Sequence, residues 1–479
     1  MVSYGSLKKK RSDKMNKFKE KLRTLLSPGA QNLTRGAIRP QLVRFAVPLI
    51  LANLLQALYG AVDMIIVGHF TDPVGLSAVA LGAEFMSTVT SFIFGFCLAT
   101  TTMVGNYYGA ERKDDIKKTI TTEFALCLFC SLLASCLVCF KIDGFLRLLG
   151  TPSESMSVTR DYVFICTAGL VTVIFYNGIS AIFRGFGDSI SPLIFVATSC
   201  VLNIFGDLLL VGGFKLGAAG AAYATVASQG ISALLAYHYA KARDYQITKG
   251  FSLFKPHKDK LLTMIRIGFP SAVQFSIVGF SFIFILRMIC KMEGFLGAAG
   301  AGVVTKLDAF SMLLPMSFSI ATSAMVAQCM GAKKYIRATN VLKQSILLSA
   351  TVGLVIFLAL EASPQTFIHI FTSERSVTLK ATQYLRSFAI DVFLVCFVFS
   401  FGGYFIGTGH TEIPMIVGII TAGVRVLASY ELSLLPGADM TTLGFAPPIT
   451  SLLQLAIYFS IFYYQIKHET YKKSKLQGL

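Results

Sequence analysis

Four oxygen-bearing side chains stand inside long apolar runs of the sequence. Asp63 lies in one run, Asn203 and Asp207 lie in another, and Thr225 lies in the run that follows. Asn203 and Asp207 are four residues apart, so a helix would place both on one face. Oxygen ligands suit hard cations such as Na⁺, and a carboxyl group among apolar helices is costly to ionise, which suits it to carry a proton. The four residues are therefore a candidate site for a coupling cation.

Structural roles compete with this interpretation. Asn203 and Thr225 could simply hydrogen-bond neighbouring helices, whereas an unpaired carboxylate gains nothing from burial in lipid. Pro48 removes a main-chain donor in mid-run and predicts a helix kink. The other polar residues inside the runs could have a functional role or a structural one. In the structural role, the basic residues among them would neutralise the acidic ones. These residues are Glu84, Lys306, Asp308, Asp391 and Arg425.

The runs that hold these residues are long enough to cross a membrane. Of the 479 residues, 54% are hydrophobic and 14% are charged, against about a quarter charged in an ordinary soluble domain. A helix of about 20 apolar residues spans the hydrocarbon core, and these runs are too continuously apolar for barrel strands. We therefore predict an all-α integral membrane protein with twelve transmembrane helices. The predicted spans are 42–67, 76–108, 119–140, 161–184, 190–212, 217–240, 262–288, 298–330, 341–361, 383–407, 412–432 and 445–466.

The net charge of +18 reflects an uneven distribution of basic residues. Most of the 43 lysines and arginines fall in alternate loops and in the two ends of the chain. By the positive-inside rule these segments face the cytoplasm. We therefore expect a multi-pass protein of the cell (plasma) membrane with both termini cytoplasmic. Its basic loops are expected to face membrane lipids, not nucleic acid.

The second half of the sequence repeats the first at one constant offset. Pro48 recurs as Pro270, and Gly109 recurs as Gly331. Each half then holds six spans, an even number, so both halves enter the membrane in the same orientation and are related by a pseudo-twofold axis along the membrane normal. The predicted division is a basic cytoplasmic N-terminal arm (1–41), an N-lobe (42–240), a cytoplasmic linker (241–261), a C-lobe (262–466) and a cytoplasmic tail (467–479).

Motifs for catalysis, for metal binding and for ATP hydrolysis are missing from the sequence. The ten cysteines lie mostly within apolar runs and have no ligand spacing, so we predict no structural metal and no disulfide framework. There is no phosphate-binding loop, and no HExxH or GxSxG motif. We therefore expect no catalytic residue, no enzyme activity, and no cofactor apart from H⁺ or Na⁺ as a coupling ion.

Four groups of residues form ordered motifs along the chain. They are Pro48 with Gln56 and Val62-Asp63, the segment Ala99–Gly105 with Gly109-Ala110, Arg184–Asp188 with Pro192, and Asn203 and Asp207 with Thr225. Each motif is loose alone, but in order and duplicated the motifs are specific. In these motifs the chain resembles the multidrug and toxic compound extrusion (MATE) family from about residue 40 to residue 466.

The resemblance implies twelve helices in two pseudo-symmetric six-helix lobes around a central cavity. It also implies secondary active multidrug efflux, in which organic cations are exported in exchange for H⁺ or Na⁺ by alternating access. Position by position, it places the cation-coupling site on Asp63, Asn203, Asp207 and Thr225, and the substrate cavity on Gln56, Tyr59 and Asn177. A carboxylate pair that some members carry in the C-lobe falls on Val278 and Val395, which cannot bind a cation.

One alternative is a lipid-linked precursor flippase of the related superfamily. Such a carrier would need several arginines or lysines in its cavity to hold pyrophosphate, and the spans of the N-terminal half contain almost none. The sequence favours small organic cations as partners and a monomeric carrier. The choice between Na⁺ and H⁺ stays open at this point.

Overall fold

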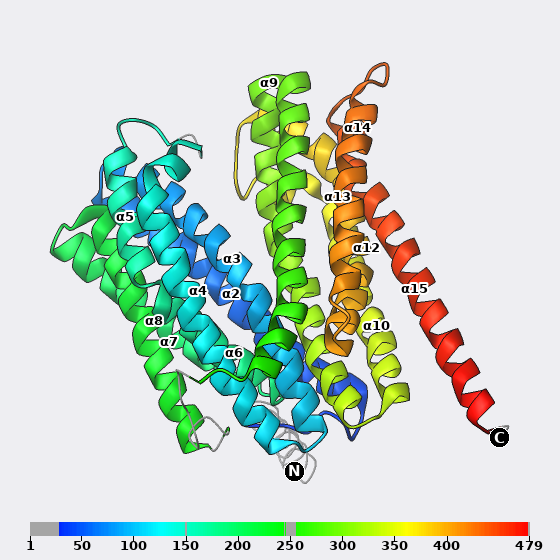
Figure 1. Ribbon diagram of the computed structural model, residues 1–479. Helices are drawn as coiled ribbons and strands as arrows, with labels where there is room; N and C mark the ends of the chain where they lie inside the picture. The colour runs from blue at the N-terminus through cyan, green and yellow to red at the C-terminus, as the bar shows by residue number, and fades with distance from the viewer. Residues whose placement is uncertain (1–27, 149–150, 244, 246–254, 478–479) are drawn as a thin grey trace, which may run out of the picture.

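The computed structural model describes residues 28–148, 151–243, 245 and 255–477. Within these residues the regular structure is helical, and no strand occurs. Figure 1 shows long helices standing side by side in two groups, which are the two lobes. The all-helical fold predicted from the apolar runs is therefore confirmed.

The described part of the N-lobe contains seven α-helices and a short π-helix. Asp72 caps the second of them, because its side chain accepts a hydrogen bond from the Gly75 amide at 2.8 Å and Pro73 takes the first helical position. The helices are α2 (Ile38–Phe70), α3 (Pro73–Gly109), α4 (Lys113–Leu148), α5 (Met156–Ala168), α6 (Leu170–Gly185), α7 (Ile190–Asp207), η1 (Leu208–Gly213) and α8 (Gly217–Ala242).

The C-lobe follows with a second set of helices. They are α9 (Lys258–Gly331), α10 (Tyr335–Ala362), α11 (Pro364–Ile368), α12 (Arg375–Thr408), α13 (Glu412–Ser433), α14 (Met440–Gly444) and α15 (Ala446–Gln477). The predicted linker, 241–261, includes the end of α8 and the start of α9, and its residues 244 and 246–254 lie outside the described residues. Most of the predicted N-terminal arm lies outside them as well.

The long element α9 folds back on itself. A straight helix of its 74 residues would measure roughly 110 Å. Both of its ends instead contact the same end of α3, because Lys260 Nζ donates to Tyr107 OH at 3.1 Å and Gly331 packs against Asn106. The chain reverses at Gly294, which has a φ of 60° that glycine adopts without strain. The element therefore supplies two antiparallel arms.

The helices account for the twelve predicted spans, with one of them broken. Nine helices of the described residues are long and apolar enough to cross a membrane, and the pair α5 and α6 makes ten. The remaining two predicted spans, 217–240 and 262–288, fall on α8, which is rich in alanine and glycine, and on the first arm of α9. The span predicted over 161–184 is not one straight helix, because α5 and α6 meet at Gly169 with a bend of 48°.

Equivalent contacts recur in the two lobes at the offset of the sequence repeat. A Cβ atom added to Gly185 would lie 2.7 Å from Cβ of Val104, and one added to Gly407 would lie 2.8 Å from Cβ of Val326. The second pair is the counterpart of the first at the same offset that relates Pro48 to Pro270. The repeat therefore preserves helix packing, as two pseudo-symmetric lobes require.

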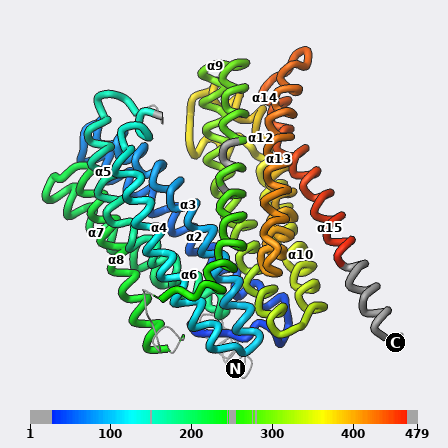
Figure 2. Tube along the Cα trace, viewed as in Figure 1, coloured from blue at the N-terminus to red at the C-terminus, as the bar shows by residue number. Residues whose placement is uncertain are grey.

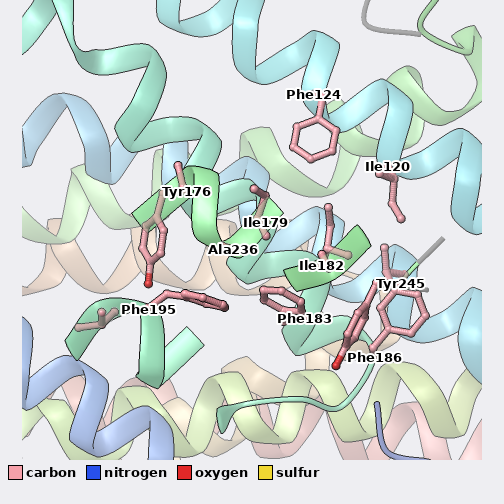
Figure 3. Packing of buried hydrophobic residues seen from close by; sticks show 14 of the residues in the cluster. Ile120, Phe124, Tyr176, Ile179, Ile182, Phe183, Phe186, Phe195, Ala236 and Tyr245 are labelled. Atoms are coloured by element: carbon pink, nitrogen blue, oxygen red, sulfur yellow. The ribbon is translucent and has the colours of Figure 1, made fainter. Parts of the chain in front are cut away.

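The N-lobe has an aromatic core between α6 and α7 (Figure 3). The ring of Phe183 stacks on that of Phe195 at 6.1 Å and meets the ring of Tyr245 edge-on at 4.9 Å. The Tyr245 hydroxyl donates to Asp188 at 2.6 Å. Burial, and then the negative charge of Asp188, raise the pKa of Tyr245. This core fixes the start of α7, the helix that carries Asn203 and Asp207.

The two lobes contact each other at the end of the molecule where α3 ends. There a Cβ atom on Gly109 would lie 2.0 Å from the Gln328 carbonyl oxygen, and one on Gly331 would lie 1.8 Å from that of Asn106. Figure 2 shows the lobes close together at this end and diverging toward the opposite one. Only glycine allows α3 and α9 to approach so closely.

Residues 28–37 cross the junction between the lobes. The Gly29 amide donates to Asp188 Oδ2 of the N-lobe at 3.0 Å, and the Leu33 amide donates to Gln328 Oε1 of the C-lobe at 2.9 Å. Both acceptor side chains are buried. This segment therefore ties the two lobes together at their closed end.

Candidate functional site

A cavity of about 360 Å³ lies within the N-lobe and is lined by residues of α2, α3, α5, α6, α7 and α8. Its wall combines one carboxylate, several hydroxyl and amide groups, and the sulfur atoms of methionine and cysteine. The lining residues are Gln56, Tyr59, Gly60, Asp63, Met64, Ala83, Met86, Ser87, Thr90, Tyr162, Cys166, Val173, Tyr176, Val196, Ser199, Cys200, Thr225, Val226 and Gln229. None of these lining residues is basic.

Helical spacing explains which side chains face the cavity. Gln56, Tyr59 and Asp63 follow one another at intervals of three and four residues in α2, so they share one face of that helix. Thr225 and Gln229 are four residues apart in α8 and also share a face. These two helix faces therefore contribute five polar side chains to the wall.

Thr225 joins three of the polar groups. Its hydroxyl oxygen accepts a hydrogen bond from the Tyr59 hydroxyl at 3.1 Å and a longer one from Asn203 Nδ2 at 3.4 Å. This arrangement turns the amide oxygen of Asn203 away from Thr225, and Oδ1 has no hydrogen-bond donor among the described residues. Thr225 thus links α2, α7 and α8 at the site.

The carboxyl groups of Asp63 and Asp207 lie next to each other. Asp207 is the last residue of α7, where the helix continues into the π-helix η1. In the described part of the chain, both oxygens of Asp207 and Oδ1 of Asp63 lack a donor. Two carboxylates can only accept, so they share a hydrogen bond only when one of them carries a proton.

The site therefore gathers four buried acceptor oxygens that have no donor within the described chain: three from Asp63 and Asp207 and one from Asn203. Buried polar atoms are normally satisfied, and buried like charges repel each other. A bound proton would relieve the repulsion by joining the carboxyl groups. An alkali cation would do so by accepting several of the oxygens as ligands. The geometry is thus suited to a small cation.

The structure brings the predicted coupling residues together but divides them between two layers. Asp63 and Thr225 line the cavity, whereas Asn203 and Asp207 lie behind them and are fully buried. Of the predicted cavity residues, Gln56 and Tyr59 line the wall. Asn177 does not, because its amide donates to the carbonyl oxygen of Val173 in its own helix at 2.9 Å.

Sequence reasoning missed several residues of this region. Tyr162, Ser199 and Gln229 line the cavity, and no motif marks them because Ser and Tyr are common in membrane helices. Glu123 of α4 is fully buried and accepts a hydrogen bond from Thr100. A glutamate inside a predicted span was a sufficient signal for that residue.

The C-lobe differs from the N-lobe at the positions that matter here. Val395 is buried and apolar, and the side chain of Val278 lies outside the described residues. Lys306 lies inside a predicted span and could have neutralised a buried carboxylate. Its side chain is exposed, so it does not have that role. Asp308, Asp391 and Arg425 lie close together. Glu84 is at the surface of α3 and does not line the cavity.

Proline 48 lies inside α2, and the helix continues through it. The ring contributes no main-chain donor at that position, so the helix is weakened there. The kink predicted at Pro48 stays a prediction.

Comparison with known proteins places the chain in a family. The sequence model of the MatE family matches residues 48–209 and again residues 270–430. The probable multidrug resistance protein YpnP of Bacillus subtilis (strain 168) is 31% identical over 311 residues, which cover 63% of this chain and 67% of that protein. The probable multidrug resistance protein NorM of Thermotoga maritima is 26% identical over 396 residues, covering 80% and 83%.

Solved structures share the fold. One of a multidrug resistance MATE family transporter of the MOP superfamily, in its outward-facing conformation, superposes with a TM-score of 0.85 at 20% identity and covers 91% of this chain and 98% of its own. The two family matches begin at Pro48 and at Pro270, the pair of prolines that the internal repeat relates. The chain belongs to the MatE family of multi-pass membrane transporters.

Proposed function

We propose that this protein is a secondary active multidrug antiporter that exports organic cations in exchange for H⁺ or Na⁺ by alternating access. The observation that carries the proposal is the polarity of the N-lobe cavity, whose wall includes Asp63 and, among its described lining residues, no basic side chain. A cavity of this polarity attracts a cation and repels a phosphate. It therefore disfavours a flippase of lipid-linked precursors.

The size and composition of the cavity also fit this substrate class. A volume of about 360 Å³ falls within the usual range for sites of small molecules, about 300–1,000 Å³. Tyr59, Tyr162 and Tyr176 offer ring faces to a cation, and Met64 and Met86 adapt to ligands of different shape. The wall thus suits several flat, monovalent organic cations.

The coupling cation would bind at Asp63, Asn203, Asp207 and Thr225. When H⁺ or Na⁺ occupies the unpaired oxygens of this cluster, it neutralises the charge that attracts a cationic drug. Cation and drug then compete for the cavity. Opposite preferences of the two ligands for the two conformations of the lobes are sufficient to couple their movements.

The lobes would open the cavity to one side of the membrane at a time, by separating at one end while they close at the other. In this structure the end where α3 ends is closed by the contact of α3 with α9 and by residues 28–37. The distribution of basic residues supports a cytoplasmic position for that end, with both termini inside. The structure then corresponds to a cavity that faces outward. We expect the carrier to act as a monomer.

The test is transport into everted membrane vesicles that contain the protein. A ΔpH and a Na⁺ gradient are imposed in separate experiments. A fluorescent planar organic monocation should accumulate in one of these experiments and not in the other. Asp63→Asn and Asp207→Asn should each abolish gradient-driven uptake. Asp114→Asn is the matched control, because that side chain is 88% exposed.

The proposal fails if neither gradient drives uptake of any organic cation by folded protein. It also fails if Asp63→Asn and Asp207→Asn together leave uptake at the wild-type rate. Binding restricted to a lipid pyrophosphate would instead support the flippase.

A further inference from the structure

A second buried cluster of charged side chains lies in the C-lobe, away from the cavity. Asp308 is on the second arm of α9, Asp391 on α12 and Arg425 on α13. Asp391 is 2% exposed and Arg425 is 6% exposed. The two carboxylates and the guanidinium interact electrostatically with one another. Charges at this depth are costly and need an explanation.

Neutral groups hold Arg425 in its position. Its Nε donates to the hydroxyl of Thr450 at 3.1 Å, its Nη1 donates to the hydroxyl of Ser281 at 3.0 Å, and its guanidinium lies 4.7 Å from the ring centre of Phe282. No ion pair joins Arg425 to either carboxylate in the part of the chain described here. The positive charge is therefore near the carboxylates but does not neutralise them by contact.

The carboxylates keep oxygen atoms without a donor. Asp391 has a side-chain hydrogen bond with Ser451, yet its Oδ1 and the Oδ1 of Asp308 are both buried and have no donor among the described residues. Tyr384 is the other titratable group that interacts with the pair. With all three charged side chains ionised, the cluster carries one net negative charge. Such a charge is strongly unfavourable away from water.

The composition of the cluster favours a proton over a metal cation. A proton needs only one lone pair, whereas Na⁺ needs several oxygen ligands arranged around it. A metal cation would also be repelled by the guanidinium of Arg425. One proton taken up by either of the two carboxyl groups makes the cluster neutral.

We propose that Asp308 and Asp391 form a proton-binding site in the C-lobe that takes up a single proton, with Arg425 as its fixed positive charge. The site is separate from the N-lobe cluster, and its occupancy does not depend on the proposed function. Its contribution to transport rests on that function.

The internal repeat relates the two sites. Arg425 is the counterpart of Asn203 at the offset of the repeat, and the two residues make comparable contacts. Asn203 Nδ2 donates to the hydroxyl of Thr225 in α8, and Arg425 Nε donates to the hydroxyl of Thr450 in α15. The C-lobe thus carries a fixed cation where the N-lobe carries an amide. At the C-lobe position that corresponds to the N-lobe cluster, the guanidinium would repel a metal cation, whereas a proton can still bind the carboxyl groups.

Infrared spectroscopy of the reconstituted protein tests the proposal, because a protonated carboxyl group has its own carbonyl band. The parent variant carries Asp63→Asn, Asp207→Asn and Glu123→Gln, so these three buried acids of the N-lobe do not contribute. At near-neutral pH this variant should show the band of one protonated carboxyl group. The control, Asp114→Asn in the same background, should leave that band unchanged.

Removing one carboxyl group should have an effect that follows from the charge balance of the cluster. Asp308→Asn alone and Asp391→Asn alone should each abolish the band, because the remaining carboxylate is then balanced by Arg425. Arg425→Gln should increase the band about twofold, since both carboxyl groups then become neutral. Asp391→Glu keeps a carboxyl group and should keep a band, which controls for a variant that fails to fold.

Three results would overturn the proposal. They are the absence of a band in the parent variant, a band of half intensity that persists in both single Asn variants, and a band that is insensitive to all C-lobe substitutions. In transport, Asp391→Asn should lower the number of protons exchanged per substrate without abolishing drug export. Unchanged stoichiometry would refute its link to transport while leaving the infrared result, and the N-lobe function, to stand separately.

Discussion

The contact between α3 and α9 offers a direct way to shift the balance between the two conformations of the lobes. A Cβ atom on Gly331 would lie 1.8 Å from the carbonyl oxygen of Asn106, where contacts below 3.0 Å essentially never occur. In a Gly331→Ala variant the helices must therefore separate by roughly 1 Å, which costs about 1–3 kcal/mol in a packed interface. That cost falls only on the state in which this end is closed. The population ratio should shift about 5–150-fold toward the other state.

Distances between spin labels on the two lobes would measure this shift. Labels introduced by Lys113→Cys and Ile336→Cys, both exposed, report on the closed end once the exposed cysteines have been replaced. These are Cys136, Cys139 and Cys290. Gly331→Ala should populate longer distances than the parent.

Gly302→Ala is the matched control, because Gly302 lies in the same element and nothing lies within 4 Å of its added Cβ atom. Its distance distribution should equal that of the parent. If a folded Gly331→Ala protein also keeps the parent distribution, the reasoning that glycine packing stabilises the closed end is refuted.

Three further predictions concern stability, the site and topology. Asp188→Ala should lower the midpoint of thermal unfolding, because it leaves several buried hydrogen-bond donors without an acceptor, at a cost of about 1–3 kcal/mol each. An unchanged midpoint would contradict this. Tyr59→Phe removes a hydrogen bond to Thr225 worth about 0.5–1.5 kcal/mol, so the apparent affinity for the driving cation should fall a few fold in titrations of transport, with a larger effect at Thr225→Ala. Cysteines placed by Lys333→Cys and Thr372→Cys should be labelled only from the cytoplasm and only from outside, respectively, and outside labelling of the first would invert the proposed orientation.

Much of the fold could be predicted because a long hydrophobic run in lipid must form a helix to satisfy its backbone hydrogen bonds. Each predicted span falls on one helix, except that the span over 161–184 is divided between α5 and α6 and the span over 190–212 continues from α7 into η1. The constant offset of the sequence repeat reappears as equivalent glycine contacts. The breaks were harder to predict. The residues between the seventh and eighth predicted spans form a helical hairpin around Gly294, and the bend at Gly169 interrupts a run with uniform hydropathy. Both depend on how one helix packs against its neighbours, which composition does not encode.

The candidate site was partly predictable for a similar reason. Asn203 and Asp207 share a helix face by spacing alone, and α2 places Asp63 opposite them. Asn177 was predicted at the cavity, but its amide bonds its own helix. Rotation of α6 about its axis decides which way that side chain points, and no local pattern reveals such a rotation. Glu123 was overlooked although it is an acid inside a span.

The proximity of Arg425 to Asp308 and Asp391 could not be predicted from the sequence. The three residues come from three helices that are far apart in the chain. Sequence reasoning left open whether such residues neutralise one another. The structure brings them together but leaves two carboxyl oxygens without donors among the described residues, so neutralisation by Arg425 is incomplete.

Displacement of the bound cation by substrate tests the central claim most directly. Purified protein in a weakly buffered solution is titrated with an organic monocation, while released protons are followed with a pH dye and released radioactive sodium is followed in parallel. The wild-type protein should release one of the two cations in proportion to the substrate bound. The Asp63→Asn and Asp207→Asn double variant should bind substrate without releasing either. Release that is undiminished in the double variant, or substrate binding to the wild type that displaces neither cation, would contradict the claim that drug and coupling ion compete at this pair of carboxylates.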